Sequence, residues 1–321
     1  METRKLPDEL FLRASYRTFL RREPDELGSN HYLQALRSQR VKRWKVVNSI
    51  IRSPEFRQGN ILEALHRARV MVVSTCLPPA QVVVDLGGAA NGRPEGALLF
   101  MGYPHRPAQI TIVDLPPSQR FNWTADPEPS QDFVTPAGVR VRYLYGSMAD
   151  LSLISDTSVD LVWCGESIEH VTEEEADAVC RQAYRVLRPG GYFCLDTPNA
   201  SLTRLQSPEA FIHPEHKKEY HVAELRAKLE AAGLQVLEAK GVCPMPKSLQ
   251  EGVFKAGELV RNIALSEVPE QGYLFYLKAV RPVRKTRPAA SSGAVRMNTL
   301  SSPEGWPKTA KYWSRKPRLI G

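Results

Sequence analysis

The chain has 321 residues, 42% of them hydrophobic, and a formal net charge of +8. This composition is typical of a globular protein, and the length allows one large and one smaller domain. No apolar run approaches the roughly 20 residues that a membrane-spanning helix needs, and the charged N-terminus lacks the apolar segment of a secretory signal. The five cysteines form neither a disulfide framework nor a CxxC pair, so we expect a cytoplasmic protein without a cysteine-based zinc site.

Four helical segments within residues 1–76 predict a separate all-helical domain. Asp25 and Ser53 are typical caps of helix N-termini, and Leu77-Pro78-Pro79 interrupts the chain before the first expected strand. The spacing of apolar residues predicts that the first helix buries one face. The residues expected on that face are Leu10, Phe11, Ala14, Phe19 and Leu20.

A buried strand and a small-residue loop follow at residues 82–92, which read VVVDLGGAANG. The strand is apolar, as in a parallel sheet that helices cover on both faces. Asp85 comes near its carboxyl end, where open α/β sheets bind ligands, and Gly87 and Gly88 let backbone amides approach a ligand closely. The loop matches neither G-x-G-x-x-G nor the P-loop pattern, so this segment alone fits several nucleotide-like cofactors.

Further strands alternate with helices along the chain. ITIVD ends in Asp114, whose carboxylate is placed to accept hydrogen bonds from two vicinal ribose hydroxyls. Segments 141–148, 159–171 and 192–199 contain the next three strands, and the helix before the last of them stops at Arg188-Pro189-Gly190-Gly191. This alternation predicts a doubly wound, mostly parallel α/β sheet.

Three segments follow one another along the chain: VVVDLGG, VDLVWCGESIEHV and VLRPGGYFCLDTPN. Their order and spacing resemble those of three motifs of the class I S-adenosylmethionine (SAM)-dependent methyltransferases. Over residues 80–282 the chain resembles the small-molecule branch of that family. The resemblance implies SAM as cofactor and a Rossmann-like sheet of seven strands, the last of which inserts antiparallel at 271–282. Residues 221–242 supply a helix and the sixth strand, and residues 246–264 predict one extra helix that serves as a lid or a dimer surface.

The resemblance also implies where the cofactor binds, at the carboxyl ends of the first four strands. The expected cofactor-binding residues are Asp85, Gly87, Gly88, Ala89, Asp114, Leu115, Ser147, Met148, Ala149, Gly165 and Glu166. Some of these positions depart from the family pattern. Ala89 and Asn91 replace later glycines of the first motif, and Ser147 replaces the acid that usually meets the adenine. The span from Asp85 to Asp114 is also longer than usual, which predicts a longer first helix or loop.

Polar residues after the fourth and fifth strands form the expected acceptor side. His170 follows the fourth strand, and a histidine ordinarily titrates near neutral pH, which suits a general base. The loop at 213–221 lies where this family often builds its acceptor pocket. The residues assigned are His170 and His216 as catalytic, and Glu169, Asn199, His213 and Tyr220 as substrate-binding. The structural alternatives are a capping or packing role for His170 and a polar surface loop at 213–221.

A metal site is weakly indicated in the same loop. His213, Glu215 and His216 have spacing that fits ligands on a helix, but Pro214 makes the local geometry uncertain. We therefore expect no bound metal.

The basic excess is concentrated at the C-terminus. From Arg281 on there are ten Lys or Arg residues and one Glu, in a stretch rich in Pro, Ser and Gly. We expect residues 283–321 to be a disordered tail. We expect it to be either simply solvated or in electrostatic contact with an acidic partner, a lipid headgroup or nucleic acid, anchored by Trp306, Tyr312 and Trp313.

The N-terminal pattern Y-R-x-F-L-x-R-E-P-D-x-x-G, continued to Phe56, resembles a small bacterial helical domain fused to enzymes of surface-polysaccharide clusters. Together the resemblances imply a bacterial SAM-dependent methyltransferase that acts at oxygen on a small molecule or glycan, in polysaccharide or secondary metabolism. One alternative is a nucleic-acid methyltransferase, which the basic tail favours and the lack of a D/N-P-P-Y/F segment opposes. Another is an inactive SAM-fold scaffold docked through its helical domain. The oligomeric state is not predicted.

Overall fold

The computed structural model describes residues 7–20, 22–120 and 132–283. The predicted basic tail and its aromatic residues therefore lie outside the described residues. The helices are α1 (Asp8–Leu20), α2 (Glu26–Arg37), α3 (Arg43–Ile51), α4 (Pro54–Cys76), α5 (Ala97–Phe100), α6 (Glu173–Val186), α7 (Ala200–Gln206), α8 (Val222–Ala231), α9 (Pro246–Glu251) and α10 (Ala256–Arg261). The strands are β1 (Val82–Leu86), β2 (Gln109–Asp114), β3 (Asp132–Val134), β4 (Arg140–Tyr145), β5 (Val159–Gly165), β6 (Leu187–Pro198), β7 (Gln235–Pro244), β8 (Leu265–Ser266) and β9 (Gly272–Val280).

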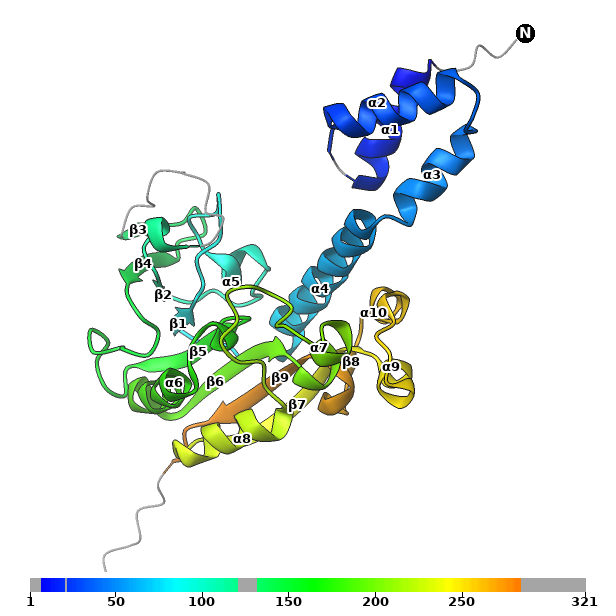
Figure 1. The fold of residues 1–321 in the computed structure, drawn as a ribbon. Helices are drawn as coiled ribbons and strands as arrows, with labels where there is room; N and C mark the ends of the chain where they lie inside the picture. Colours follow the sequence, from blue (N-terminus) through cyan, green and yellow to red (C-terminus); the bar gives the residue numbers. More distant parts are fainter. Residues whose placement is uncertain (1–6, 21, 121–131, 284–321) are drawn as a thin grey trace, which may run out of the picture. The chain divides into compact units, whose positions relative to one another are not determined.

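One sheet of nine strands, in the order β3-β4-β2-β1-β5-β6-β9-β7-β8, organises the larger part of the chain (Figure 1). β4, β2, β1, β5 and β6 pair in parallel, and β9 inserts antiparallel between β6 and β7. All seven predicted strands are present, including the antiparallel last strand, and the doubly wound fold is confirmed. β3 and β8 are short additions at the two edges, with too few residues for a recognisable strand pattern.

Helices cover both faces of this sheet. Because successive strand residues point to opposite faces, neighbours in one strand enter different cores. Val84 and Val162 pack with α6 and α8, whereas Val83 and Leu161 belong to a core shared with α4 and α5. Both cores combine β-branched and aliphatic side chains with aromatic ones, and the continuous apolar strand segments predict such burial on both faces.

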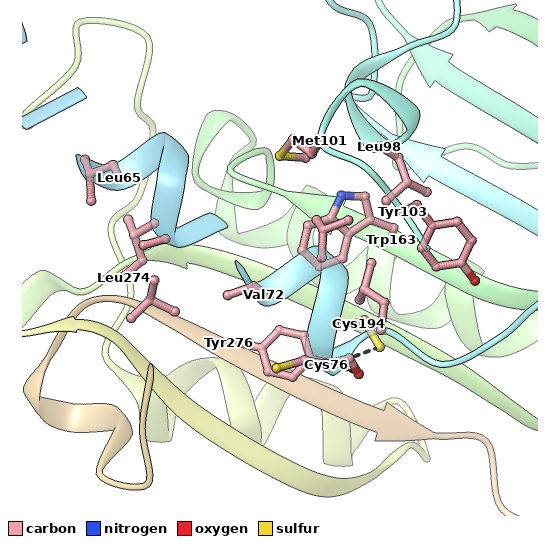
Figure 2. Close-up of a cluster of buried hydrophobic side chains, with 14 of the residues drawn as sticks. Leu65, Val72, Cys76, Leu98, Met101, Tyr103, Trp163, Cys194, Leu274 and Tyr276 are labelled. Atoms are coloured by element: carbon pink, nitrogen blue, oxygen red, sulfur yellow. Dashed lines mark hydrogen bonds between the residues drawn. The ribbon is translucent and has the colours of Figure 1, made fainter. Parts of the chain in front are cut away.

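The second half of α4 is part of the sheet core, which the sequence pattern does not indicate. Figure 2 shows Val72 and Cys76 of α4 beside Trp163 and Tyr276 of the sheet, and Leu65 of the same helix belongs to the same core. The Tyr276 hydroxyl donates to the carbonyl oxygen of Cys76 at 3.2 Å, which fixes the end of the helix. The domain boundary proposed after residue 76 thus separates a helix from the sheet on which it packs.

The first three helices have a small core of their own. Leu12 and Tyr16 of α1 pack with Leu36, Val46 and Ile50. The predicted buried face of α1 is therefore partly wrong: Leu10 is 50% exposed, because the buried pair lies at positions 12 and 16, one turn apart. Asp25 and Ser53 cap α2 and α4 as expected, each accepting a hydrogen bond from a backbone N–H of the first turn.

Two predicted helices differ in length from expectation. The extra helix at 246–264 is split into α9 and α10, because Gly252 ends α9 in the left-handed conformation. The longer connection between Asp85 and Asp114 is mostly loop, with α5 only four residues long. All five cysteines are buried and free. Within the described ranges, no helix is both long and apolar enough to cross a bilayer.

Candidate active site

The loop after β1 is shaped by glycines that the packing requires. Gly87 has a φ of 68°, and a Cβ there would lie 2.4 Å from the Ser167 hydroxyl oxygen. A Cβ on Gly88 would lie 2.1 Å from the carboxyl carbon of Asp85. These contacts bring the β1 loop against both its own strand and the segment after β5, so two of the expected cofactor-binding stretches are adjacent.

Asp85 is a buried acid with an incomplete set of hydrogen bonds. Its side chain is 1% exposed, and Oδ2 has no hydrogen-bond partner among the described residues. Burial, reinforced by the nearby Asp114, raises the pKa of Asp85 to about 8. A buried carboxyl with an unpaired oxygen is suited to a cationic ammonium group, such as the one at the amino-acid end of SAM.

Asp114 ends β2 beside the same loop. Its carboxylate accepts hydrogen bonds from the amides of Ala89 at 2.9 Å and Leu115 at 2.7 Å, and Arg120 lies 3.4 Å away. The structure therefore brings together Asp114, Ala89 and Leu115, three of the expected cofactor residues. The same carboxylate oxygens can also accept hydrogen bonds from two vicinal ribose hydroxyls, beside those from the two amides.

The residues after β4 approach the loop less closely. Met148 would be 3.7 Å from a Cβ on Gly87, so it borders the cofactor loop. Met148 and Ala149 are partly buried against the core, whereas Ser147 is exposed and accepts a hydrogen bond from the Ala149 amide at 3.2 Å. Met148 therefore lies beside the β1 loop, whereas Ser147 is at the surface.

The carboxyl end of β5 is held by an arginine from α4. Arg69 pairs with Glu166 at 2.8 Å and with Asp196 of β6 at 3.0 Å, and the Asp196 side chain is fully buried. Glu166 has a φ of 46°, and its amide donates to the carboxylate of Asp196 at 3.0 Å. A Cβ on Gly165 would lie 2.6 Å from the Arg69 guanidinium, which explains the glycine. Neither Arg69 nor Asp196 was expected to belong to the site.

Three histidines meet beside this ion-pair network. The ring centroids of His170 and His216 are 4.9 Å apart, and those of His170 and His213 are 5.6 Å apart. His170 lies in a 3-10 turn, Ile168–His170, that follows β5, and the other two lie in the loop between α7 and α8. Burial, with smaller effects from His216 and His213, lowers the pKa of His170 to about 4, so its ring is neutral at pH 7.

Two buried glutamates support the cluster. Glu219 accepts a hydrogen bond or ion pair from His216 Nδ1 at 2.9 Å, and bonds from the Thr203 hydroxyl and the Ile212 amide. Glu169 accepts from the Thr197 hydroxyl at 2.9 Å, and burial raises its pKa well above the ordinary value. Glu219 contacts the cluster directly and was not among the residues named from the sequence.

A pocket of about 280 Å³ joins these groups to α4. Its polar lining includes Glu166, Glu169, His170, His213 and His216. Its apolar lining comes from Ile61, Leu62 and Leu65 of α4, from Ile212 and from Pro198. The volume is close to the ~300 Å³ lower limit of typical small-molecule sites.

Two expected substrate residues have structural roles instead. Asn199 is 1% exposed, caps α7 by accepting from the Ser201 amide, and donates to the carbonyls of Glu270 and Gly272. Tyr220 is fully buried in the core of the α6 and α8 face. Their assignment to the acceptor is corrected, because their side chains are committed to the loop and the core.

Comparisons with known proteins agree with this geometry. Residues 88–195 match the family model of a methyltransferase domain, and residues 2–60 match that of a domain of unknown function, DUF4214. A ubiquinone biosynthesis O-methyltransferase from Xanthomonas axonopodis pv. citri is 31% identical over 233 residues, which are 69% of this chain and 85% of that protein. The chain belongs to the SAM-dependent methyltransferases.

A second relative matches a shorter stretch of this methyltransferase. A protein named as a probable SAM-dependent methyltransferase from Mycolicibacterium smegmatis is 38% identical over 116 residues, which are 35% of this chain and 44% of that protein. A solved SAM-dependent methyltransferase from Archaeoglobus fulgidus, 14% identical, covers 74% of this chain with a TM-score of 0.42. Membership of the family makes SAM the methyl donor, and the implied cofactor and enzyme class are confirmed.

Proposed function

We propose that this methyltransferase transfers its methyl group to a hydroxyl oxygen of a small acceptor that also has an apolar portion. The observation that carries the proposal is the mixed lining of the pocket: aliphatic side chains of α4 and three histidines line the same cavity. An acceptor with both an apolar body and a hydroxyl fits this lining. Curated relatives that are named as ubiquinone biosynthesis O-methyltransferases support oxygen as the methylated atom.

The cofactor is proposed to bind over the carboxyl ends of β1, β2, β4 and β5. Asp85 and the amides of the 87–89 loop would hold its amino-acid end, and Asp114 with Leu115 its ribose. Residues 147–149 would border the adenine, and Gly165 with Glu166 would lie next to the methyl group. When bound, SAM supplies a methyl group that its sulfonium already activates. The bond between methyl carbon and sulfur breaks as the bond to the acceptor oxygen forms.

The residues of this chain would then align the acceptor and remove its proton. The apolar wall of α4 keeps water from the acceptor body and restricts its orientation, which lowers the entropy cost of an in-line displacement. His170 lines the same pocket and accepts the hydroxyl proton, while Glu219 holds His216 in place beside it. His216 and His213 fix the hydroxyl within reach of His170.

The domain organisation remains our proposal: a helical domain over 1–76, a methyltransferase domain over 80–282 and a basic tail over 283–321. The cytoplasmic location and the glycan or polysaccharide context are likewise proposals, and the context depends on the N-terminal resemblance. A nucleic-acid acceptor depends on the tail. The acceptor screen therefore includes sugars and nucleic acid beside phenols.

The test combines cofactor binding with an acceptor screen. Isothermal titration with SAM should give binding in the wild type that is lost in Asp114→Ala. Methyl transfer would then be followed by mass spectrometry with alkyl-substituted phenols, nucleotide sugars and single-stranded nucleic acid. We expect transfer to the phenols, with a KM at least tenfold higher in Leu62→Glu, a pocket residue that is 59% exposed. Leu27→Glu, on a residue 84% exposed in α2, is the control. Transfer to sugars or nucleic acid alone would contradict the proposed acceptor.

A further inference from the structure

We propose that His170, His213 and His216 bind one divalent transition-metal ion, of the kind represented by Zn²⁺, at the polar side of the acceptor pocket. One ring nitrogen from each histidine lies within 4.8 Å of the corresponding nitrogens of the others. From the sequence we expected no bound metal here. The cluster forms because the loop before α8 brings His213 and His216 to the turn after β5 that holds His170.

The surroundings of His216 are those of a metal-binding histidine. Its Nδ1 lies 2.9 Å from a carboxylate oxygen of Glu219, and both side chains are buried. A carboxylate behind one ring nitrogen fixes the ring and directs the other nitrogen, Nε2, toward a metal. Glu219 is held in turn by Thr203 and by the Ile212 amide, so this support is rigid.

The remaining geometry needs only a small contraction. Zn–N bonds of about 2.0–2.1 Å in a tetrahedral site place the ligand nitrogens about 3.4 Å apart. Binding would require the three nitrogens, now within 4.8 Å of one another, to move closer by rotation of the side chains. His213 Nδ1 accepts a long, 3.3 Å hydrogen bond from the Glu215 amide, and ligation through Nε2 would give up that bond. Three imidazoles leave a fourth position open, toward the pocket that they line.

The role of the fourth coordination position, as the site where the acceptor binds, rests on the proposed function. A hydroxyl of the acceptor coordinated there would lose its proton more readily, because a bound divalent ion lowers the pKa of oxygen ligands. The proton would pass to water at the partly exposed His213 side of the site. The ion would thus replace direct proton acceptance by His170, and the acceptors favoured would be those that coordinate well, such as vicinal diols on an aromatic ring.

The test measures metal binding separately from catalysis. Full-length, tag-free protein would be stripped with chelator and titrated with Co²⁺, whose visible absorption reports tetrahedral nitrogen ligands, and with Zn²⁺ by calorimetry. We expect one ion per chain, with affinity reduced at least tenfold in His213→Ala and in His216→Gln. His105→Ala, in a loop outside the cluster, should bind as the wild type does. Circular dichroism and SAM titration would verify that each variant is folded.

The outcomes separate this inference from the proposed function. No Co²⁺ or Zn²⁺ binding, or equal binding in all three variants, would overturn the metal site. If the stripped enzyme still methylates phenols at full rate, the metal role fails while the proposed function stands with His170 as base. Metal binding that depends on His213 and His216, together with activity restored by the ion, supports both.

Discussion

Replacement of Arg69 by methionine should destabilise the protein strongly. Arg69 is the only cation paired with the fully buried Asp196 among the ion pairs of the described residues, and it also pairs with Glu166. Removal of one partner of a buried ion pair typically costs ~3–5 kcal/mol, because the remaining charge stays desolvated. Since whole domains are stable by only ~5–15 kcal/mol, we expect the urea midpoint to fall markedly at an unchanged m-value.

The control variants separate charge from packing. Arg69→Met with Asp196→Asn should recover part of the lost stability, because the amide keeps an acceptor for the Glu166 N–H and carries no charge. Arg13→Met, which breaks an exposed pair with Glu23, should leave the unfolding curve unchanged. A loss below about 1 kcal/mol in Arg69→Met, or a double variant no more stable than the single one, would refute the buried-charge argument.

Two further predictions concern the cofactor loop. Gly88→Ala places a methyl group against the Asp85 carboxyl, so it should lower the free energy of unfolding by ~1–3 kcal/mol and abolish SAM binding. The control Gly59→Ala lies in α4 with open space around it and should raise the free energy of unfolding, measured with urea, by ~0.5–1 kcal/mol. Because Asp85 has a pKa of about 8 and cationic SAM favours its ionised form, SAM affinity should rise with pH, by up to about tenfold from pH 6 to 7. Titration calorimetry of Asp85→Asn should give a flat profile over this range; a flat profile in the wild type would count against contact between Asp85 and the ammonium group.

The sheet could be predicted because its evidence is local. Each central strand is a continuous apolar run, and Asp85 and Asp114 mark the carboxyl ends of β1 and β2. The helix stop at 188–191 follows from the same kind of short pattern, whereas the antiparallel insertion of β9 was implied by the family resemblance. The edge strands β3 and β8 carry no such pattern, since two or three residues cannot show alternation.

The acceptor site could be predicted only in part. All three histidines of the cluster were named from the sequence, but their meeting depends on the path of the loop before α8. Asn199 stands directly before α7 and caps it, whereas Tyr220 lies beyond α7 and is buried in the core. Residue type alone does not distinguish a polar group that faces a ligand from one that caps a helix or packs inside. Asp196 was missed because an acid at the end of a strand was not expected to pair with a helix from outside the sheet.

Arg69 and the apolar pocket residues Ile61, Leu62 and Leu65 were not predicted from the sequence, because all of them belong to α4. This helix has 23 residues and meets different surroundings along its length: pocket at Ile61 and Leu62, buried carboxylates at Arg69, and the sheet core at Val72. A helix that changes partners every turn or two presents no single apolar stripe, so its sequence is typical of a linker helix. The same helix positions Glu166 and lines the pocket. Substitutions on its pocket side should therefore change acceptor preference, and those at Arg69 should change stability as well.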